Sequence, residues 1–214
     1  MRAVSEKSLD SDWLLTVGSA SEIEMKVKNS RFLSCVAPAK NKEDAEAFIR
    51  AISKKHRDAT HVCFAYRTVC GDLSVFRYSD AGEPAGTAGR PILMAMDSRG
   101  IRFAVCVVVR FFGGTKLGTG GLSRAYGQAA AAALEKAGII KKWNTILQEV
   151  VFPYEYTGIV RWLLSRYQCT VDRTQHEEGT KILVHVRKSL SGKLKQALLD
   201  ATAGKARLDA VHRV

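Results

Sequence analysis

The sequence lacks several features that would place the protein outside the cytoplasm. No apolar run reaches the length of a membrane-spanning helix, and the N-terminus carries no apolar segment of the signal-peptide type. The five cysteines are odd in number and scattered without a Cys-x-x-Cys pair, so neither a disulfide framework nor a zinc ribbon is indicated. His61 and Cys63 form the closest metal-type pair, and we expect a partly buried histidine beside a core thiol there. These absences predict a cytoplasmic protein without a membrane segment, a metal or a cofactor.

Two familiar nucleotide-binding motifs are also missing, although one stretch is rich in glycine. After the β-branched run of residues 105–109 come Arg110, two phenylalanines and then five glycines within nine positions. Lys116 is followed by Leu117 and not by Ser or Thr, which excludes a P-loop. The third glycine and the later acidic residue of a dinucleotide-binding fingerprint are absent as well. A phosphate bound here must therefore be held in another way.

The same stretch nevertheless has the features of an anion site. A buried strand would feed a glycine-rich turn at the start of an alanine-rich helix, which we expect to begin near Leu122. Glycine permits positive φ and close backbone approach, and the free N–H groups and the dipole of a helix favour negative charge. The candidate residues for binding an anion or a nucleic acid are Arg110, Gly113, Gly114, Lys116, Gly118, Gly120, Gly121, Arg124, Tyr126 and Arg90. The alternative is that the glycines only form a tight turn packed against the sheet.

A second candidate site contains two carboxylates. Asp80 and Glu83 lie three positions apart, just before a predicted helix, and such a pair can act as acid and base or hold a magnesium ion. The alternative is that they cap the free N–H groups of that helix or pair with Arg90 or Arg110. The serines and histidines show no spacing typical of a Ser-His-acid triad, so we expect a protein without catalytic activity.

The charge of the chain points to a polyanionic partner. Basic residues exceed acidic ones by 12, with 20 basic and 14 acidic residues in 1–140 and 13 and 7 in 141–214. Both halves are therefore expected to face the same polyanion, although a generally basic composition is the alternative. Aromatic residues lie beside basic ones in Arg110-Phe111-Phe112 and Arg124-Ala125-Tyr126, and an exposed ring can stack on a base. Strand neighbours face opposite ways, so at least one of the two phenylalanines is expected in the core.

Periodicity divides the chain into a loose lead-in over 1–18, a first domain over 19–138 and a second domain over 145–214. In the first domain, a strand pair or one bent strand is predicted over 23–27 and 32–36, and further strands over 61–69, 73–78 and 105–109. Helices are predicted after an Asn41 cap, over 86–96 and over 122–136. The strands 61–69 and 73–78 are expected to join at a Gly71-Asp72 turn. This mixed order favours a two-layer α/β sandwich.

The second domain follows the order β-α-β-β-α-β, which is the ferredoxin-like pattern. Strands are predicted over 146–154, 169–175, 181–187 and 207–214, and the middle pair is expected to turn at Glu178-Gly179. Ile159, Trp162 and Leu163 mark the expected buried face of its first helix. The second helix is expected over 194–201 and to end at Gly204. The overall fold class is therefore α+β.

Several motifs between Asn29 and Lys136 resemble those of the IMPACT family, which is called YigZ-like in bacteria. They are SDAGEPAGTAGRP, GRPILMAM, VVVRFFGGTKLG, LGTGGL and SRAYG. The resemblance implies a first domain of the left-handed βαβ ribosomal-protein type and a ferredoxin-like second domain, similar to domains IV and V of elongation factor G. It implies a non-enzymatic RNA- or ribosome-binding protein with a role in translation or its regulation. The alternative is a phosphate- or nucleotide-binding protein, or an enzyme, that uses the glycine-rich turn for a phosphate-bearing small ligand.

Overall fold

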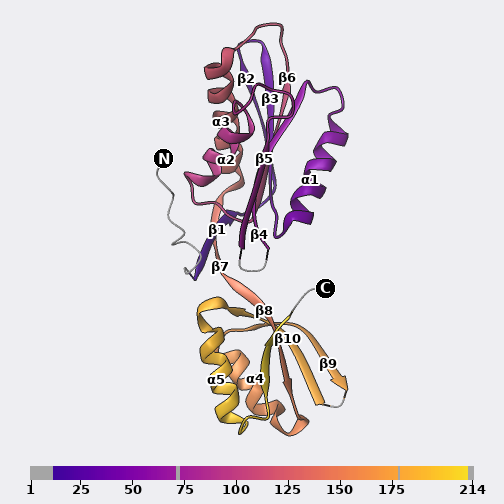
Figure 1. Ribbon diagram of the computed structural model, residues 1–214, viewed down its shortest axis with the longest axis vertical. Coiled ribbons are helices and arrows are strands. Elements are labelled where there is room, and N and C mark those ends of the chain that lie inside the picture. Colours follow the sequence, from indigo (N-terminus) through magenta and orange to yellow (C-terminus); the bar gives the residue numbers. More distant parts are fainter. Residues whose placement is uncertain (1–11, 71–72, 178, 212–214) are drawn as a thin grey trace. The chain divides into compact units, whose positions relative to one another are not determined.

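The computed structural model describes residues 12–70, 73–177 and 179–211 (Figure 1). The chain divides into two compact units. One is Leu14–Lys142, and the other contains Trp13 and Trp143–Val214. No helix in these ranges combines the length and the apolar character needed to cross a bilayer.

The first unit is built on a five-stranded antiparallel sheet in the order β2-β3-β6-β4-β5. Its strands are β2 (Ser21–Val27), β3 (Ser30–Pro38), β4 (His61–Cys70), β5 (Leu73–Ser79) and β6 (Ala104–Phe111). The central strand β6 is buried from Ala104 to Arg110. Its alternate residues enter two separate cores, because Cys106 and Val108 face one and Val105 and Val107 face the other. A strand that is apolar on both faces must be covered on both faces.

Helices accordingly lie on both sides of this sheet (Figure 1). Helix α1 (Lys42–Lys55) packs on one face, and α2 (Gly89–Asp97) and α3 (Gly118–Ala137) pack together on the other. The α+β class is confirmed, with one layer more than the two-layer sandwich that the sequence predicted. Helix α1 begins as predicted, because the Asp44 N–H donates to Asn41 Oδ1 over 2.8 Å and caps the first turn.

Regular structure also occurs where the sequence predicted none. Strand β1 (Trp13–Val17) lies in the expected loose lead-in and pairs with β7 (Ile139–Trp143), which lies in the expected connection. The lead-in up to residue 11 lies outside the described residues. All five side chains of β7 are exposed, so no alternation of apolar residues revealed this strand. The Gly71-Asp72 turn also lies outside the described residues.

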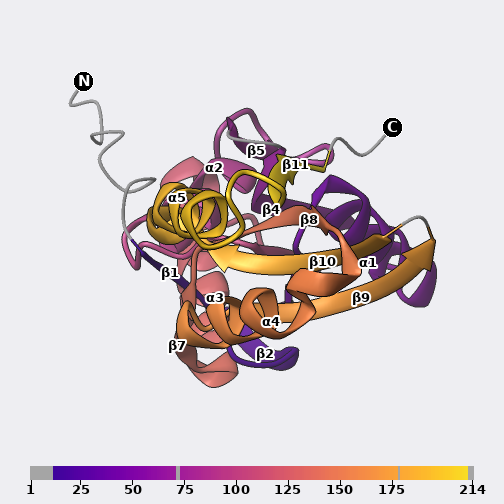
Figure 2. The ribbon, with the colours of Figure 1, turned by 90° about the horizontal axis from the view of Figure 1, so that it is seen from below.

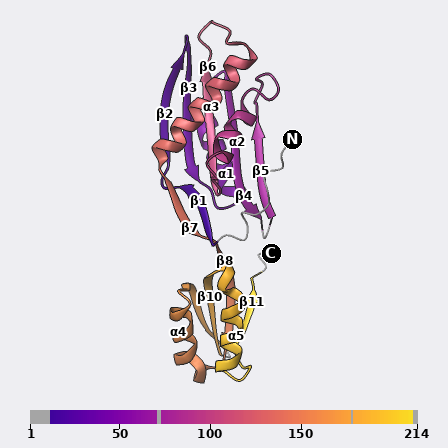
Figure 3. The same ribbon diagram turned by 90° about the vertical axis from the view of Figure 1, so that its left-hand side faces the viewer.

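The second unit has the predicted ferredoxin-like order, with an antiparallel sheet β11-β8-β10-β9. Its elements are β8 (Thr145–Phe152), α4 (Thr157–Arg166), β9 (Thr170–Glu177), β10 (Gly179–Arg187), α5 (Ser191–Ala201) and β11 (Arg207–Ala210). Figure 2 shows β8, β10 and β9 side by side, and Figure 3 shows both helices on one face of the sheet. Glu178 and residues 212–214, which belong to the predicted turn and last strand, lie outside the described residues.

The predicted buried face of α4 was wrong in part. The helix buries Val160, Leu163 and Leu164, whereas Ile159 is 37% and Trp162 is 53% exposed. Both sets have i, i+3, i+4 spacing, and their centres lie one residue apart on the helix. The sequence alone did not decide between these overlapping stripes.

Candidate functional site

Three neighbouring strands of the first unit place three side chains of the candidate site next to one another. Arg110 on β6 pairs in register with Phe32 on β3 and with His61 on β4. Residues directly opposite each other in antiparallel strands point to the same face of the sheet. Phe32 belongs to the core beneath α2 and α3, so Arg110 and His61 point to that side as well.

Arg110 and Glu83 form a buried ion pair in this core. They are only 5% and 8% exposed, and Arg110 Nη1 donates to Glu83 Oε1 over 2.7 Å. The Tyr126 hydroxyl, from α3, donates to the same oxygen over 2.8 Å, and Arg110 Nη2 donates to Ser30 Oγ over 3.3 Å. Charges buried this deeply need such partners, because an unpaired charge in an apolar core is strongly unfavourable.

Tyr126 is therefore part of this network and not a surface for stacking. Its ring is fully buried and packs edge to face on Phe32 at 5.2 Å between centroids. Burial, together with the neighbouring Cys63 and Glu83, raises the pKa of Tyr126, so its hydroxyl remains a donor. Burial likewise raises the pKa of the Cys63 thiol to about 12, and this thiol donates to the Asp80 carbonyl over 3.0 Å. The expected buried thiol is confirmed.

Asp80 organises the loop that carries Glu83. Its carboxylate accepts hydrogen bonds from the N–H groups of Gly86, Ala88 and Gly89 at 2.8 to 2.9 Å. Burial acts to raise the pKa of Asp80, but these three hydrogen bonds outweigh it and hold the pKa below its usual value. The sequence left two interpretations of Asp80 and Glu83, a site for acid–base or magnesium chemistry and a structural role. The observed contacts are those of the structural role, because Asp80 caps backbone N–H groups and Glu83 pairs with Arg110.

His61 lies near the second carboxylate oxygen of Glu83, Oε2. Its Nδ1 lies 2.9 Å from the Ala81 carbonyl oxygen, which can only accept, so Nδ1 carries the proton. Its Nε2 lies 3.9 Å from Glu83 Oε2, which is too long for a direct hydrogen bond. Glu83 Oε1 is thus occupied by Arg110 and Tyr126, whereas Oε2 has no donor among the described residues.

The glycine stretch differs from its prediction at the start of α3. The helix begins at Gly118 and not near Leu122, so Gly118, Gly120 and Gly121 form its first turn. No side chain caps this turn, and its first N–H groups have no acceptor within the helix. Positive φ occurs at Gly114 (83°) and Gly118 (71°). Gly113 has another reason to be glycine, because an added Cβ would lie 1.8 Å from the Asn29 carbonyl oxygen.

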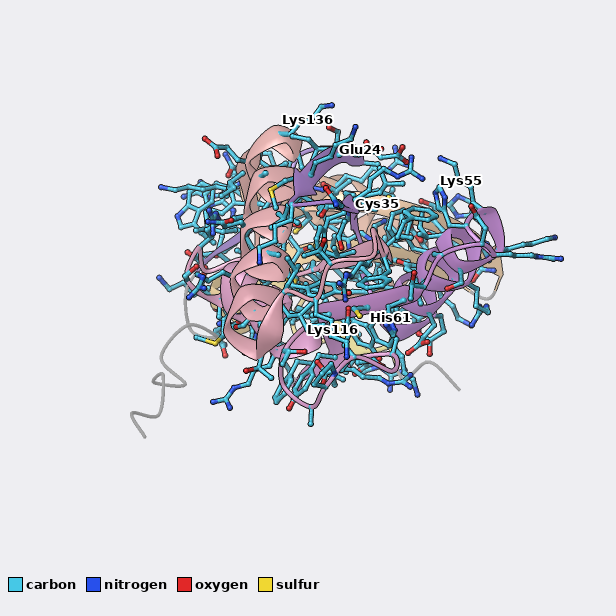
Figure 4. The ribbon with its side chains drawn as sticks, turned by 90° about the horizontal axis from the view of Figure 1, so that it is seen from above. Glu24, Cys35, Lys55, His61, Lys116 and Lys136 are labelled. Carbon is cyan, nitrogen blue, oxygen red and sulfur yellow. The ribbon has the colours of Figure 1, made fainter. Side chains whose placement is uncertain are left out.

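These elements enclose a pocket of about 400 Å³ at the N-terminus of α3. Its lining residues come from β4, the 80–89 loop, the end of β6 and the start of α3: Thr60, His61, Glu83, Pro84, Arg110, Phe112, Lys116, Leu117, Gly118, Thr119 and Leu122. Figure 4 shows His61 and Lys116 close together at this end of the unit. The Phe112 ring is 46% exposed and its centroid lies 5.4 Å from the Arg110 guanidinium carbon.

Only part of the predicted site converges on this pocket. Arg110, Lys116 and Gly118 line it together with Glu83, one residue of the acidic pair. The remaining candidates do not line it: Gly113, Gly114, Gly120, Gly121, Arg124, Tyr126, Arg90 and Asp80. Arg90 is exposed on α2, and Arg124 is exposed on α3, with its Nη1 3.8 Å from where a Cβ at Gly120 would lie. Arg110 is buried and paired, so it contributes to the pocket floor and not to an open basic surface.

The sequence interpretation missed His61 and Phe112 as pocket residues. His61 reaches the site through the register between β4 and β6, which no short motif encodes. Phe112 was named only as a stacking candidate, and the signal for its exposure was the expected opposite orientation of Phe111, which packs beside the α1 core. Within the described ranges, no three His, Cys, Asp or Glu side chains cluster so as to hold a metal ion.

The pocket has mostly apolar walls and offers three kinds of contact to a ligand. Lys116, which forms no ion pair with any described residue, and the free N–H groups of the α3 first turn favour a negatively charged group. Glu83 Oε2 offers an acceptor on the floor, as does His61 Nε2 whenever the ring is neutral. Phe112 offers an exposed ring. A ligand with an anionic end, a flat ring and hydrogen-bond donors satisfies all three.

Comparisons with known proteins agree on one family. Residues 28–134 match the Impact N-terminal domain. The chain is 40% identical over 184 residues to an IMPACT family member of Thermus thermophilus, covering 84% of this chain and 97% of that protein. It is 39% identical over 153 residues to IMPACT family member YigZ of Escherichia coli, covering 69% and 72%. A solved structure described as a hypothetical protein superimposes with a TM-score of 0.71 at 28% identity, covering 95% of this chain and all of that one.

Proposed function

The chain belongs to the IMPACT family, and from this premise we propose that it is a non-enzymatic RNA- or ribosome-binding protein with a role in translation or its regulation. The observation that carries the proposal is the pocket at the start of α3, where Lys116, free helix amides and the exposed Phe112 ring meet. Phosphate groups bind at such amides, and bases stack on such rings. One site thus offers contacts to both parts of a nucleotide unit.

The distribution of charge supports a long polyanion as the partner. Each half of the chain has six more basic than acidic residues, so contacts from both units to one RNA are favourable. The resemblance of the two domains to domains IV and V of elongation factor G adds a ribosomal context to this proposal. That resemblance is an analogy of fold, and the pocket chemistry supplies the specific argument.

The contacts of the carboxylates support binding without catalysis. Asp80 accepts three backbone hydrogen bonds that hold its loop, and Glu83 Oε1 accepts from Arg110 and Tyr126. A general base needs an oxygen free to take a proton and a pKa near the working pH. The pKa of Asp80 is lowered and its carboxylate is occupied by backbone N–H groups, so Asp80 stabilises the loop and is a poor general base.

The test is the salt dependence of RNA binding by the full chain, measured by fluorescence anisotropy with a labelled single strand and a labelled hairpin. Log K should fall linearly with log [salt], with a slope of about −0.7 to −0.9 for each phosphate neutralised. Lys116→Glu should weaken binding and reduce the slope by about that amount for one phosphate. Lys26→Glu is the matched control, since Lys26 is exposed on β2 and does not line the pocket. A flat salt dependence, or equal effects of the two variants, would contradict the proposal.

A second candidate function is the binding of a free phosphate-bearing small molecule. It is favoured by the volume of the pocket, which suits a small ligand, and by the buried Arg110 in its lining. Inorganic phosphate or a mononucleotide would then raise the melting temperature, and the rise would grow with the logarithm of its concentration above Kd, in the absence of RNA. A melting temperature that responds to RNA alone would favour the first function.

A further inference from the structure

We propose that the pocket binds a guanosine 5′-phosphate unit, with the guanine edge on Glu83 and His61 and the phosphate at Lys116 and the α3 amides. The inference rests on the proposed function, because it names the nucleotide that the same site accepts. It covers a guanylate residue within an RNA and a free guanine mononucleotide, which share this chemistry.

The floor of the pocket presents two acceptors that face each other. Glu83 is buried, with only 8% of its surface exposed. Its Oε2 has no hydrogen-bond donor among the residues that the structure describes. Because His61 Nδ1 donates to the Ala81 carbonyl, Nε2 is an acceptor whenever the ring is neutral, and it lies 3.9 Å from Oε2. Two acceptors this close are stabilised when a ligand places donors between them.

The charges around these acceptors restrict the class of donor. Arg110 lies 2.7 Å from Glu83 Oε1, and Lys116 lines the same pocket, so a cationic ligand such as an amine or a guanidinium is disfavoured. A neutral group with N–H donors, attached to an anion, fits both ends of the pocket. Among the nucleotide bases, guanine alone has two adjacent donors on one edge, its N1–H and its 2-amino group.

The geometry of the walls fits the rest of the nucleotide. The Phe112 ring and the Glu83 carboxylate flank the same Arg110 guanidinium, at 5.4 Å from the guanidinium carbon to the ring centroid and 2.7 Å between Nη1 and Oε1. A base whose edge reaches Glu83 therefore passes close to the Phe112 ring, and stacking contributes to its binding. The volume of about 400 Å³ falls within the usual range for small-ligand sites, which is roughly 300 to 1,000 Å³.

The first experiment compares GMP, IMP and AMP by calorimetric titration of the full chain. IMP lacks the 2-amino group, and AMP presents an acceptor in place of N1–H. Because hydrogen bonds to charged groups are strong, GMP should bind at least about tenfold more tightly than either. Equal affinities for the three nucleotides would overturn the inference, as would the absence of GMP binding together with RNA binding that ignores guanine.

Variants locate the preference in the pocket. His61→Ala should remove the preference for GMP over IMP while leaving the Arg110–Glu83 pair in place, and His185→Ala on β10 in the second unit is the matched control. Phe112→Ala should weaken all three nucleotides to a similar extent, about 5- to 150-fold, since stacking tolerates any base. A GMP preference that survives His61→Ala would place guanine recognition elsewhere and overturn the assignment.

A final comparison separates the two sources of the ligand and the two proposals. A short single-stranded RNA with one guanosine is compared with the same RNA carrying inosine at that position. A guanosine preference in RNA, stronger than that between GMP and IMP, identifies an RNA residue as the ligand, and a preference confined to GMP identifies the free nucleotide. RNA binding that depends on Lys116 but not on guanosine, together with equal affinities for GMP and IMP, overturns this inference and leaves the proposed function standing. A GMP preference without RNA binding supports this inference and contradicts the proposed function.

Discussion

The two units of this protein differ in what they bury beneath their sheets. The core of the second unit consists of apolar side chains, and the buried polar residues in the described part of that unit are Thr180 and Thr202. The first unit buries the Arg110–Glu83 pair and the Tyr126 hydroxyl within its larger core. Buried ion pairs are weak contributors to stability. The comparison therefore indicates that the pair in the first unit serves the pocket it lines.

The most severe way to break this comparison is Arg110→Met. It leaves the Glu83 carboxylate buried without its cation, and we expect the first unit to lose about 3 to 5 kcal/mol of its free energy of unfolding. Urea unfolding measures the loss, with Arg161→Met, at an exposed position of α4 in the second unit, as a control that costs less than about 1 kcal/mol. Adding Glu83→Leu to Arg110→Met should restore most of the stability. If it does not, the pair is a structural requirement of the fold.

A second test compares one glycine from each unit, Gly113 in the first and Gly158 in the second. Gly113→Ala places a Cβ 1.8 Å from the Asn29 carbonyl oxygen, so the backbone of the first unit must shift, at a cost of about 3 kcal/mol or more. Gly158→Ala on α4 meets no atom within 4 Å and should stabilise the second unit by up to about 1 kcal/mol. Thermal unfolding of both variants checks this. Equal effects would contradict the view that crowding, and not helix propensity, selects glycine at Gly113.

Asp80 provides a pH-dependent test. Asp80→Asn should cost about 1 to 3 kcal/mol at pH 7, because the carboxylate accepts three backbone hydrogen bonds. The folded pKa of Asp80 lies below the unfolded value of about 3.9, so this contribution is complete above that pH and is lost as the pH falls through the folded pKa. The difference between the wild-type protein and the variant should thus shrink below about pH 4. A difference that stays constant from pH 7 to pH 3 would show that another group holds the loop.

The smallest expected effect is that of Trp162→Ala in the second unit. The side chain is 53% exposed, so the substitution should change the free energy of unfolding by less than about 1 kcal/mol. Its buried neighbour Leu163 is the reference, and Leu163→Ala should cost about 2 to 5 kcal/mol. Similar losses for the two variants in urea unfolding would return Trp162 to the core face that its spacing first suggested.

Sequence patterns predicted most of the fold because most elements bury alternate or periodic apolar residues. The strand β6 and the cap at Asn41 are examples in which local chemistry decides local structure. The patterns failed where an element is stabilised by backbone pairing alone, as in the exposed strand β7. They also failed at the start of α3, where four residues rich in glycine form a helical turn despite their low propensity.

The site was less predictable than the fold for a related reason. Arg110, Lys116 and Glu83 belong to recognisable motifs, and these motifs lie near the pocket. His61 joins them only through the pairing of β4 with β6, and Tyr126 leaves the surface because its face of α3 turns toward the sheet. Both facts are set by strand register and helix rotation, which depend on packing throughout the unit.

The pairing of β7 with β1 also has a consequence for the way proteases act on this chain. The segment Ile139–Trp143 between α3 and β8 is exposed at every position, and exposed segments between domains are usually the first to be cut. Here the backbone is engaged in a ladder, and the Gly18 N–H also donates to the Gly138 carbonyl over 2.8 Å. An extended substrate must detach from its partner strand before it can enter a protease cleft. We therefore expect cleavage between residues 138 and 144 to require local unfolding of this ribbon, so that its rate reports the stability of β1 on β7.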